Sequence, residues 1–303
     1  MNYSQFLETI TKEVRERTDP EAIIHISQYQ KINLPMMDGM TILLPGENTA
    51  PTIYLDSLYQ EYLDGASLPG LAEKILAFHS ENQKIRTCDL SFYTKFEQAC
   101  KHIVCRLVNY EMNQSLLEHI PYLRFLDLAI VYYYEMENSS FGRSSILVRD
   151  AHLETWDTDV RQLHAIAVHN TRILRPYRIG TMDMLEEITH VTLPPRDPEA
   201  SCMYILTNEQ LSFGAVNIIY NDILRSVSEK IGGDFYVLPS SIHECLILPV
   251  SNWNDKEPHK LQNIVREINQ KYVSIEEILS NQVYRYSQVA DSLCLVSCKQ
   301  TTH

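Results

Sequence analysis

The chain has 303 residues, of which 45% are hydrophobic and 21% charged, so it can bury a large core without disulfides or metals. Its 39 Asp and Glu residues outnumber its 26 Lys and Arg residues, and the net charge of −13 argues against binding to phosphate backbones. The longest strongly apolar run, Leu126–Tyr134, is far shorter than the ~20 residues of a membrane helix. The N-terminus lacks the basic and apolar regions of a signal peptide. We therefore expect a cytoplasmic protein without nucleic-acid or membrane partners.

Cysteine usage and the absence of common motifs limit the chemistry further. The seven cysteines are scattered, no C-x-x-C pair occurs, and Cys245 lies in an apolar run, which predicts free thiols in a reducing compartment. The sequence contains no P-loop, no G-x-G-x-x-G, no G-x-S-x-G and no H-E-x-x-H. We therefore expect no cofactor and no metal, and the motifs leave open whether the protein is an enzyme.

The first third of the chain is expected to mix helices and strands. Phe6, Ile10 and Val14 recur every four residues, which predicts a helix that Ser4 caps and Asp19 ends. The other elements expected here are strands at 22–32, 40–44 and 51–55, a turn at 38–39, and helices at 56–64, 67–78 and 92–103.

The middle of the chain continues the mixed pattern up to a proline-rich stretch. Strands are expected at 104–110, 126–135 and 145–149, a loop at 138–142, and a helix from 156 to 174. Residues 189–201 hold Pro194, Pro195 and Pro198 without hydrophobic periodicity, which is typical of a boundary. We therefore predict an N-terminal α+β domain at 1–190 and a second domain at 200–303.

The predicted C-terminal domain has a distinct order of elements. Strands are expected at 203–206, 234–238, 245–249 and 282–286, helices at 213–231 and 258–272, and a possible further strand at 293–296. This β-α-β-β-α-β order is typical of a split βαβ sandwich. The predicted fold class is thus α+β.

One turn is the strongest candidate for a functional site. Ser240, Ser241, His243 and Glu244 lie in a polar turn between two apolar strands. Ser, His and Glu are the residue types that a nucleophile with a general base needs. The alternative is a hairpin turn whose hydroxyl groups bond the local backbone.

Asp127 is a second candidate because it is an acid inside an apolar run. Burial would raise its pKa and suit it to acid–base work, whereas an exposed strand start or a local ion pair would make it structural. Arg149 ends a predicted strand, which is a common place for ligand groups. His164 and His169 are five residues apart on a helix and thus face different sides, so they do not form a chelating pair.

Several segments resemble one bacterial family, the domain of unknown function 5688. The segments that carry the resemblance are 51–55, 113–121, 125–133, 169–171, 203–208, 234–244 and 276–284. Within them, Leu238–Glu244 is the most specific stretch. Residues 123–171 are similar, more weakly, to another uncharacterised family of Gram-positive cytosolic proteins. The resemblance implies a cytoplasmic bacterial protein and brings no activity, cofactor or catalytic residue.

Two hypotheses about function follow. The first is a non-enzymatic protein that binds or regulates another protein, because no cofactor loop, metal spacing or basic patch is present. The alternative is an enzyme or small-molecule binder centred on residues 239–244, with Asp127. A pocket that joins this turn to Asp127 or Arg149 would favour the alternative.

Overall fold

The structure is a computed structural model that describes residues 1–83, 87, 94–138, 142–181, 184, 203–253 and 258–296. The chain forms two compact units: unit 1 comprises residues 1–31 and 35–91, and unit 2 comprises 32–34 and 92–303. Both units combine helices with antiparallel sheets, which confirms the α+β class. None of the helices in the described ranges has the length and apolar character that a membrane crossing requires.

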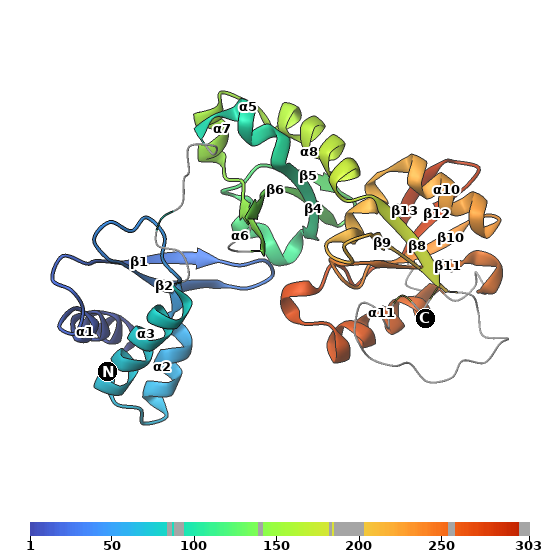
Figure 1. Ribbon diagram of the computed structural model, residues 1–303. Coiled ribbons are helices and arrows are strands. Elements are labelled where there is room, and N and C mark those ends of the chain that lie inside the picture. Colours follow the sequence, from blue (N-terminus) through green and yellow to red (C-terminus); the bar gives the residue numbers. More distant parts are fainter. Residues whose placement is uncertain are drawn as a thin grey trace. The chain divides into compact units, whose positions relative to one another are not determined.

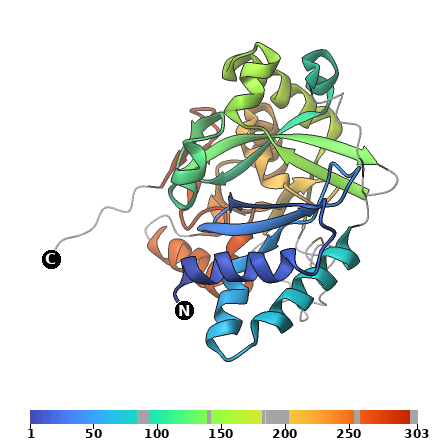
Figure 2. The same cartoon turned by 90° about the vertical axis from the view of Figure 1, so that its left-hand side faces the viewer.

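Unit 1 is a three-stranded antiparallel sheet with three helices along one side (Figure 2). Met40 and Ile42 face the helices, and Phe6, Ile10 and Val14 of the first helix meet them in one core. The elements are α1 (Tyr3–Arg15), β1 (Ile23–Gln30), β2 (Met36–Leu43), β3 (Ile53–Tyr54), α2 (Leu55–Leu63) and α3 (Leu68–Asn82).

Two local predictions in unit 1 are wrong. The helix cap is Asn2, which shares a capping box with Gln5, rather than Ser4. The predicted turn at Asp38 and Gly39 lies inside β2, paired with β1. A Cβ on Gly39 would lie 2.6 Å from the ring of Tyr29, so the glycine serves a close approach within the sheet rather than a turn.

The first sheet of unit 2 has β6 at its centre, with β4 and β5 as its two neighbours. The C-terminal half of β6 also pairs with β7. Alternation along β6 sends Tyr132 and Tyr134 to one core and Tyr133 to the other side. The elements are α5 (Phe96–Ala99), β4 (Ile103–Asn109), α6 (Gln114–Leu117), β5 (Tyr122–Phe125), β6 (Leu128–Asn138), β7 (Gly142–Leu147), α7 (Asp150–Trp156) and α8 (Val160–Leu174).

The second sheet of unit 2 has the strand order β13-β12-β10-β11-β9-β8 and is antiparallel throughout (Figure 1). β11 lies between β9 and β10, and β10 lies between β11 and β12, so both βαβ units are split, as the predicted order implies. The elements are β8 (Tyr177–Thr181), β9 (Tyr204–Asn208), α10 (Asn221–Ile231), β10 (Phe235–Leu238), β11 (Cys245–Pro249), α11 (Pro258–Tyr272), β12 (Tyr284–Ser287) and β13 (Ser292–Leu295).

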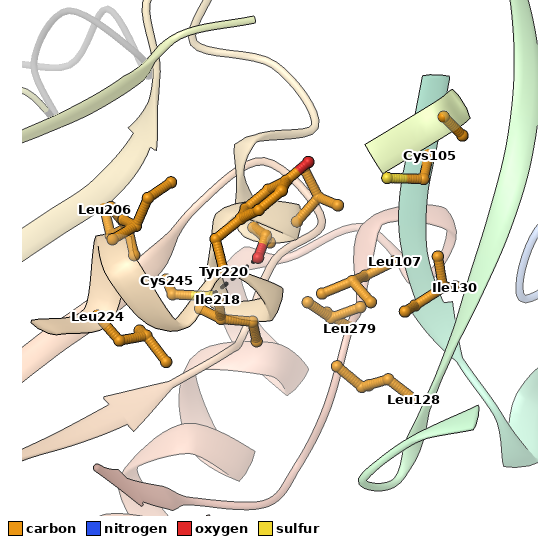
Figure 3. Packing of buried hydrophobic residues seen from close by; sticks show 14 of the residues in the cluster. Cys105, Leu107, Leu128, Ile130, Leu206, Ile218, Tyr220, Leu224, Cys245 and Leu279 are labelled. Carbon is orange, nitrogen blue, oxygen red and sulfur yellow. Dashed lines mark hydrogen bonds between the residues drawn. The ribbon is translucent and has the colours of Figure 1, made fainter. Parts of the chain in front are cut away.

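Helices α10 and α11 cover opposite faces of this second sheet. Phe235 and Val237 share a core with α10, whereas the alternate residues Tyr236 and Leu238 share one with α11. The α10 side also receives residues of the first sheet, so one hydrophobic core joins the two sheets of unit 2. Figure 3 shows Leu107 and Ile130 of the first sheet facing side chains of the second sheet and of the 214–231 segment.

Two predicted helices are shorter than expected. The segment 213–231 begins with a 3-10 helix, Gly214–Ile219, and α10 starts only at Asn221, because Tyr220 has extended backbone angles. The predicted helix at 92–103 contains only α5 and one 3-10 turn in the described residues, and Ile103 already belongs to β4.

The compact units also differ from the predicted domains. The expected boundary at 190–200 lies outside the described residues, and the two units divide near residue 91 instead. β8 precedes the expected boundary and pairs with β9 after it, so one sheet contains strands from both predicted domains.

Candidate functional site

The predicted turn is held in place by the segment that precedes β12. Ser240 and Ser241 are only 4% and 6% exposed. The carbonyl of Ser240 accepts from the backbone N–H of Leu279 (3.1 Å), and the N–H of Ile242 donates to the carbonyl of Glu277 (2.9 Å). The two serines are therefore part of a packed backbone ladder rather than of an open loop.

The His243 imidazole is used within the fold. Its Nδ1 accepts from the backbone N–H of Phe213 at 3.2 Å, and its Nε2 lies 3.5 Å from a carboxylate oxygen of Glu277. Because a backbone N–H only donates, this geometry requires an unprotonated Nδ1 and places the ring proton on Nε2. The Oγ of Ser241 accepts from the backbone N–H of His243 (3.0 Å) rather than bonding the imidazole. Ser241 thus bonds the local backbone, as the hairpin-turn alternative expects, and it does not form a nucleophile–base pair with His243.

A pocket of about 310 Å³ lies beside this turn. Ser241, His243, Glu244 and Glu277 supply its polar lining, and Leu211, Tyr272 and Val273 the remainder. Burial raises the pKa of Glu244 to about 7; the charge of Glu277 adds to this effect and a hydrogen bond from Ser241 opposes it. Three of the four turn residues named from the sequence therefore meet in one pocket.

Asp127 lies apart from this pocket. It occupies the turn between β5 and β6, not a strand, and its carboxylate accepts from the hydroxyls of Ser280 (2.6 Å) and Tyr284 (2.5 Å). Burial and then the charge of Asp127 raise the pKa of Tyr284 well above its usual value. Arg149 is exposed and precedes α7, where its N–H donates to His152 Nδ1 at 2.7 Å. The acid thus joins the two sheets of unit 2 through hydroxyl groups.

A larger pocket, of about 500 Å³, lies among residues that the sequence did not single out. β4, β6 and β7, the end of α8 and the loop 209–213 form its walls. We call it the arginine pocket, after its lining residues Lys101, His102, Arg106, Glu135, Met136, Ser144, Ser145, Leu174, Arg175, Gln210, Ser212 and Phe213.

Two arginines share one carboxylate at the base of the arginine pocket. Arg175 forms a bidentate pair with Glu135, with Nη2 to Oε1 at 2.6 Å and Nε to Oε2 at 3.2 Å. Arg106 Nη2 reaches the same Oε1 at 3.0 Å. The side chains of Arg106, Arg175 and Glu135 are 9%, 8% and 18% exposed, so this triad is a buried group with one unit of excess positive charge.

Aromatic rings pack on the Arg106 guanidinium. Its central carbon lies 4.1 Å from the ring centroid of Tyr133 and 3.7 Å from that of Phe213. Burial lowers the pKa of Arg106 from its usual value, and the partners Tyr133 and Glu135 oppose that effect. With Lys101 exposed at the same pocket, the lining carries three cationic side chains against one carboxylate in a chain whose net charge is −13.

Among the residues that the structure describes, three polar atoms in the walls of this pocket have no hydrogen-bond partner. They are Arg106 Nε, Ser144 Oγ and Gln210 Oε1, and all three are shielded from solvent. A buried polar atom left unpaired costs about 1–3 kcal/mol, so native structures keep few of them. Their concentration in one pocket is therefore a specific feature of this site.

The sequence contained one signal for this pocket. Arg106 interrupts the otherwise apolar run 103–108, which is the reasoning that selected Asp127. Glu135 follows Arg106 by 29 residues and lies on β6. Arg175 follows Glu135 by 40 residues and comes directly after α8. Only the packing of these elements reveals that the three charges meet.

The described residues contain no cluster of three or more His, Cys, Asp or Glu side chains that could hold a metal ion. Among comparisons with known proteins, the model of a family of unknown function, DUF5688, matches residues 3–288. No curated protein and no solved structure matches the chain.

Proposed function

Because the chain belongs to DUF5688, a family of unknown function, we propose a function from its own residues: the arginine pocket binds a small organic anion. The volume of about 500 Å³ is within the range of ligand sites, which is ~300–1,000 Å³. This proposal retains small-molecule binding, the alternative drawn from the sequence, and moves its centre from the 239–244 turn to Arg106, Glu135 and Arg175.

The unpaired wall atoms carry this proposal. Arg106 Nε and Ser144 Oγ can donate, and Gln210 Oε1 can accept, yet none of them has a partner in the described parts of the chain. A ligand that lets these side chains turn toward it would recover hydrogen bonds whose absence costs free energy. Arginine also suits such a site, since its planar guanidinium matches carboxylate and phosphate groups.

The charge of the pocket supports an anion over a neutral ligand. Glu135 offsets only one of the two buried arginines, and Lys101 adds a positive charge at the surface. A negative group entering the pocket would thus be attracted locally even though the whole chain is acidic. The low solvent exposure of the triad strengthens this attraction.

A binding screen with two lysine variants tests the proposal. Isothermal titration calorimetry would measure binding of small carboxylates and phosphate monoesters to the wild type, to Lys101→Gln and to Lys95→Gln. We expect at least one anion to bind, Lys101→Gln to weaken it about threefold to tenfold, and added salt to weaken it further. Lys95 is exposed and outside the pocket lining, so Lys95→Gln should leave the affinity unchanged.

Two results would contradict the proposed anion site. If no carboxylate or phosphate in the panel binds, or if both lysine variants weaken binding equally, the arginine pocket is not the anion site. A thermal-shift series gives a second measure, because a ligand at 100 times its dissociation constant adds ~2.7 kcal/mol to stability.

A protein partner in the bacterial cytoplasm is our second proposal. The apolar side chains of Ile173 and Leu174 are 60% and 45% exposed at the end of α8, next to exposed Tyr177 on the edge strand β8, and this favours a partner surface. Free Cys105 and Cys245 are buried, which supports a reducing compartment. Sedimentation velocity would test self-association: an oligomer that Ile173→Asp dissociates supports this surface, and an unchanged oligomer argues against it.

A further inference from the structure

We infer that the anion bound in the arginine pocket is a small carboxylate that also carries a hydrogen-bond donor, as in a 2-hydroxy acid. The inference rests on the proposed function and names the class of its ligand. Its basis is the combination of a singly charged triad, a buried acceptor on the lining residue Gln210 and an apolar part of the wall.

The charge of the triad favours a single negative charge. Arg106, Arg175 and Glu135 are all more than four-fifths buried, and together they carry one excess positive charge. Lys101 is exposed to water at the same pocket, so its charge is screened and does not add to the buried excess. A carboxylate balances the charge of the triad, whereas a phosphate monoester brings about −1.5 to −2 at neutral pH. An uncompensated charge in a poorly hydrated site is costly, so the carboxylate is the better match.

Gln210 sets the requirement for a donor. Its Nε2 donates to the carbonyl of Leu174 at 3.3 Å, which identifies Oε1 as the acceptor atom of the amide. Within the described part of the chain Oε1 has no hydrogen-bond partner. An arginine or lysine of the pocket does not reach this oxygen, because no hydrogen bond to it forms among the described residues. A ligand hydroxyl group would supply the missing donor once the amide turns toward the pocket.

The loop that carries Gln210 is built to hold its residues in place. Asn208 is fully buried; its Oδ1 accepts from the backbone N–H groups of Gln210 (3.1 Å) and Ser212 (3.3 Å). Arg175 Nη1 in turn reaches the carbonyl oxygen and hydroxyl of Ser212 at 3.4 and 3.3 Å. The acceptor of Gln210 and the cations of the triad are therefore parts of one connected structure.

The remaining wall suggests an apolar body for the ligand. Met136, Leu174 and Phe213 line the same pocket as the charged groups. Small ligand sites commonly combine such apolar walls with a few polar groups that fix the orientation of the ligand. A branched aliphatic acid is a suitable probe of this combination.

The test compares two acids that differ by one hydroxyl group. Calorimetry would measure 2-hydroxy-4-methylpentanoate and 4-methylpentanoate, with leucine as the ammonium-bearing analogue and isobutyl phosphate as the phosphate analogue. We expect the wild type to bind the hydroxy acid at least about tenfold more tightly than 4-methylpentanoate, since only the hydroxy acid satisfies the buried acceptor. Leucine should bind more weakly than the hydroxy acid, because its ammonium group leaves it without a net negative charge.

Gln210→Met supplies the decisive variant because methionine has a similar length and lacks the amide acceptor. The variant should bind the hydroxylated and the plain acid within about twofold of one another. Gln114→Met on α6, outside the pocket lining, is the matched control and should keep the wild-type preference.

The other outcomes separate the inference from the function on which it rests. Equal binding of the two acids by the wild type, weakened by Lys101→Gln, would overturn the donor requirement and keep the anion site. Tighter binding of isobutyl phosphate than of every carboxylate would overturn the carboxylate assignment alone. If none of the four compounds and no other anion of the screen binds, the proposed function itself fails.

Discussion

Glu244 is the residue whose environment most directly links stability to pH. Its carboxyl group lies in the turn pocket, where burial raises its pKa from the usual 4.5 to about 7. Between these two pH values the folded protein holds a proton on Glu244 that the unfolded chain releases. The contribution of Glu244 to stability is thus greatest below pH 4.5 and is lost as the pH rises through 7.

Glu244→Gln should remove this dependence. At pH 8 we expect the variant to be more stable than the wild type by up to about 3 kcal/mol, because it no longer buries a charge, and at pH 4.5 we expect little difference. Urea unfolding at a series of pH values measures the change. Glu229→Gln, at an exposed site on α10, is the control. Parallel stability curves for the wild type and Glu244→Gln would show that Glu244 titrates normally.

At the scale of single residues, the sequence identified the right chemistry in only part of the molecule. Ser241, His243 and Glu244 do share a pocket, because a short turn brings neighbours together. The bonds of His243 to Phe213 and Glu277 were not predictable, since both partners are about 30 residues away in the chain. Asp127 illustrates the same limit: its hydroxyl partners come from the far end of the chain.

At the scale of elements, Glu135 connects β4, β6 and the segment that follows α8. It accepts from Arg106 of β4 and from Arg175, and both arginine side chains are less than one-tenth exposed. Removing a shared carboxylate leaves two buried cations without their partner, which is far more costly than losing a surface ion pair.

Glu135→Gln should therefore destabilise unit 2 by about 3–5 kcal/mol. Asp222→Asn is the matched control, because it breaks an ion pair with Arg172 whose two side chains are about half exposed and should cost less than about 1 kcal/mol. Chemical unfolding of the full chain, with hydrogen exchange in β4 and β6 as the readout, measures both. Similar losses in the two variants would mean that water or rearrangement compensates the arginines.

Periodic elements were the predictable part of this fold. α11 spans Pro258–Tyr272, as its apolar spacing predicts, and β11 spans Cys245–Pro249. The predictions are wrong where local pattern and backbone geometry disagree. Residues 213–220 continue the apolar spacing of α10, yet Gly214–Ile219 form a tighter 3-10 helix whose Asn217 side chain donates to the carbonyls of Thr207 and Gly214.

At the scale of the whole molecule, the division into units does not follow the proline-rich stretch. Compactness depends on contacts between distant segments, and β8 and β9 pair across that stretch. Ile32–Leu34, which join β1 to β2 along the chain, are counted with unit 2. A sequence pattern contains no signal for such an assignment, because it follows from partners 80 or more residues away.

Asn33 forms side-chain hydrogen bonds to two distant segments of unit 2. Its side chain donates to the carbonyls of Ile275 (2.9 Å) and Ile278 (2.7 Å) and accepts from Nδ2 of the fully buried Asn113 (2.7 Å). The backbone N–H of Asn33 donates to Asn113 Oδ1 (2.8 Å). Its φ of 61° lies in the left-handed region, where asparagine and glycine are favoured. Asn33→Gly therefore keeps the backbone conformation while it removes the side-chain bonds.

We expect Asn33→Gly to destabilise unit 2 by about 2–3 kcal/mol, because it leaves Asn113 and two carbonyl groups with unmet hydrogen bonds. Hydrogen exchange on the full chain should show faster exchange at 110–113 and 275–279, while α1 of unit 1 serves as the internal reference. Faster exchange in α1 alone would mean that the asparagine stabilises unit 1 instead. Unchanged exchange everywhere would mean that the glycine backbone or water replaces the hydrogen bonds of the amide. The contacts of residues 32–34 would then not contribute measurably to the stability of unit 2.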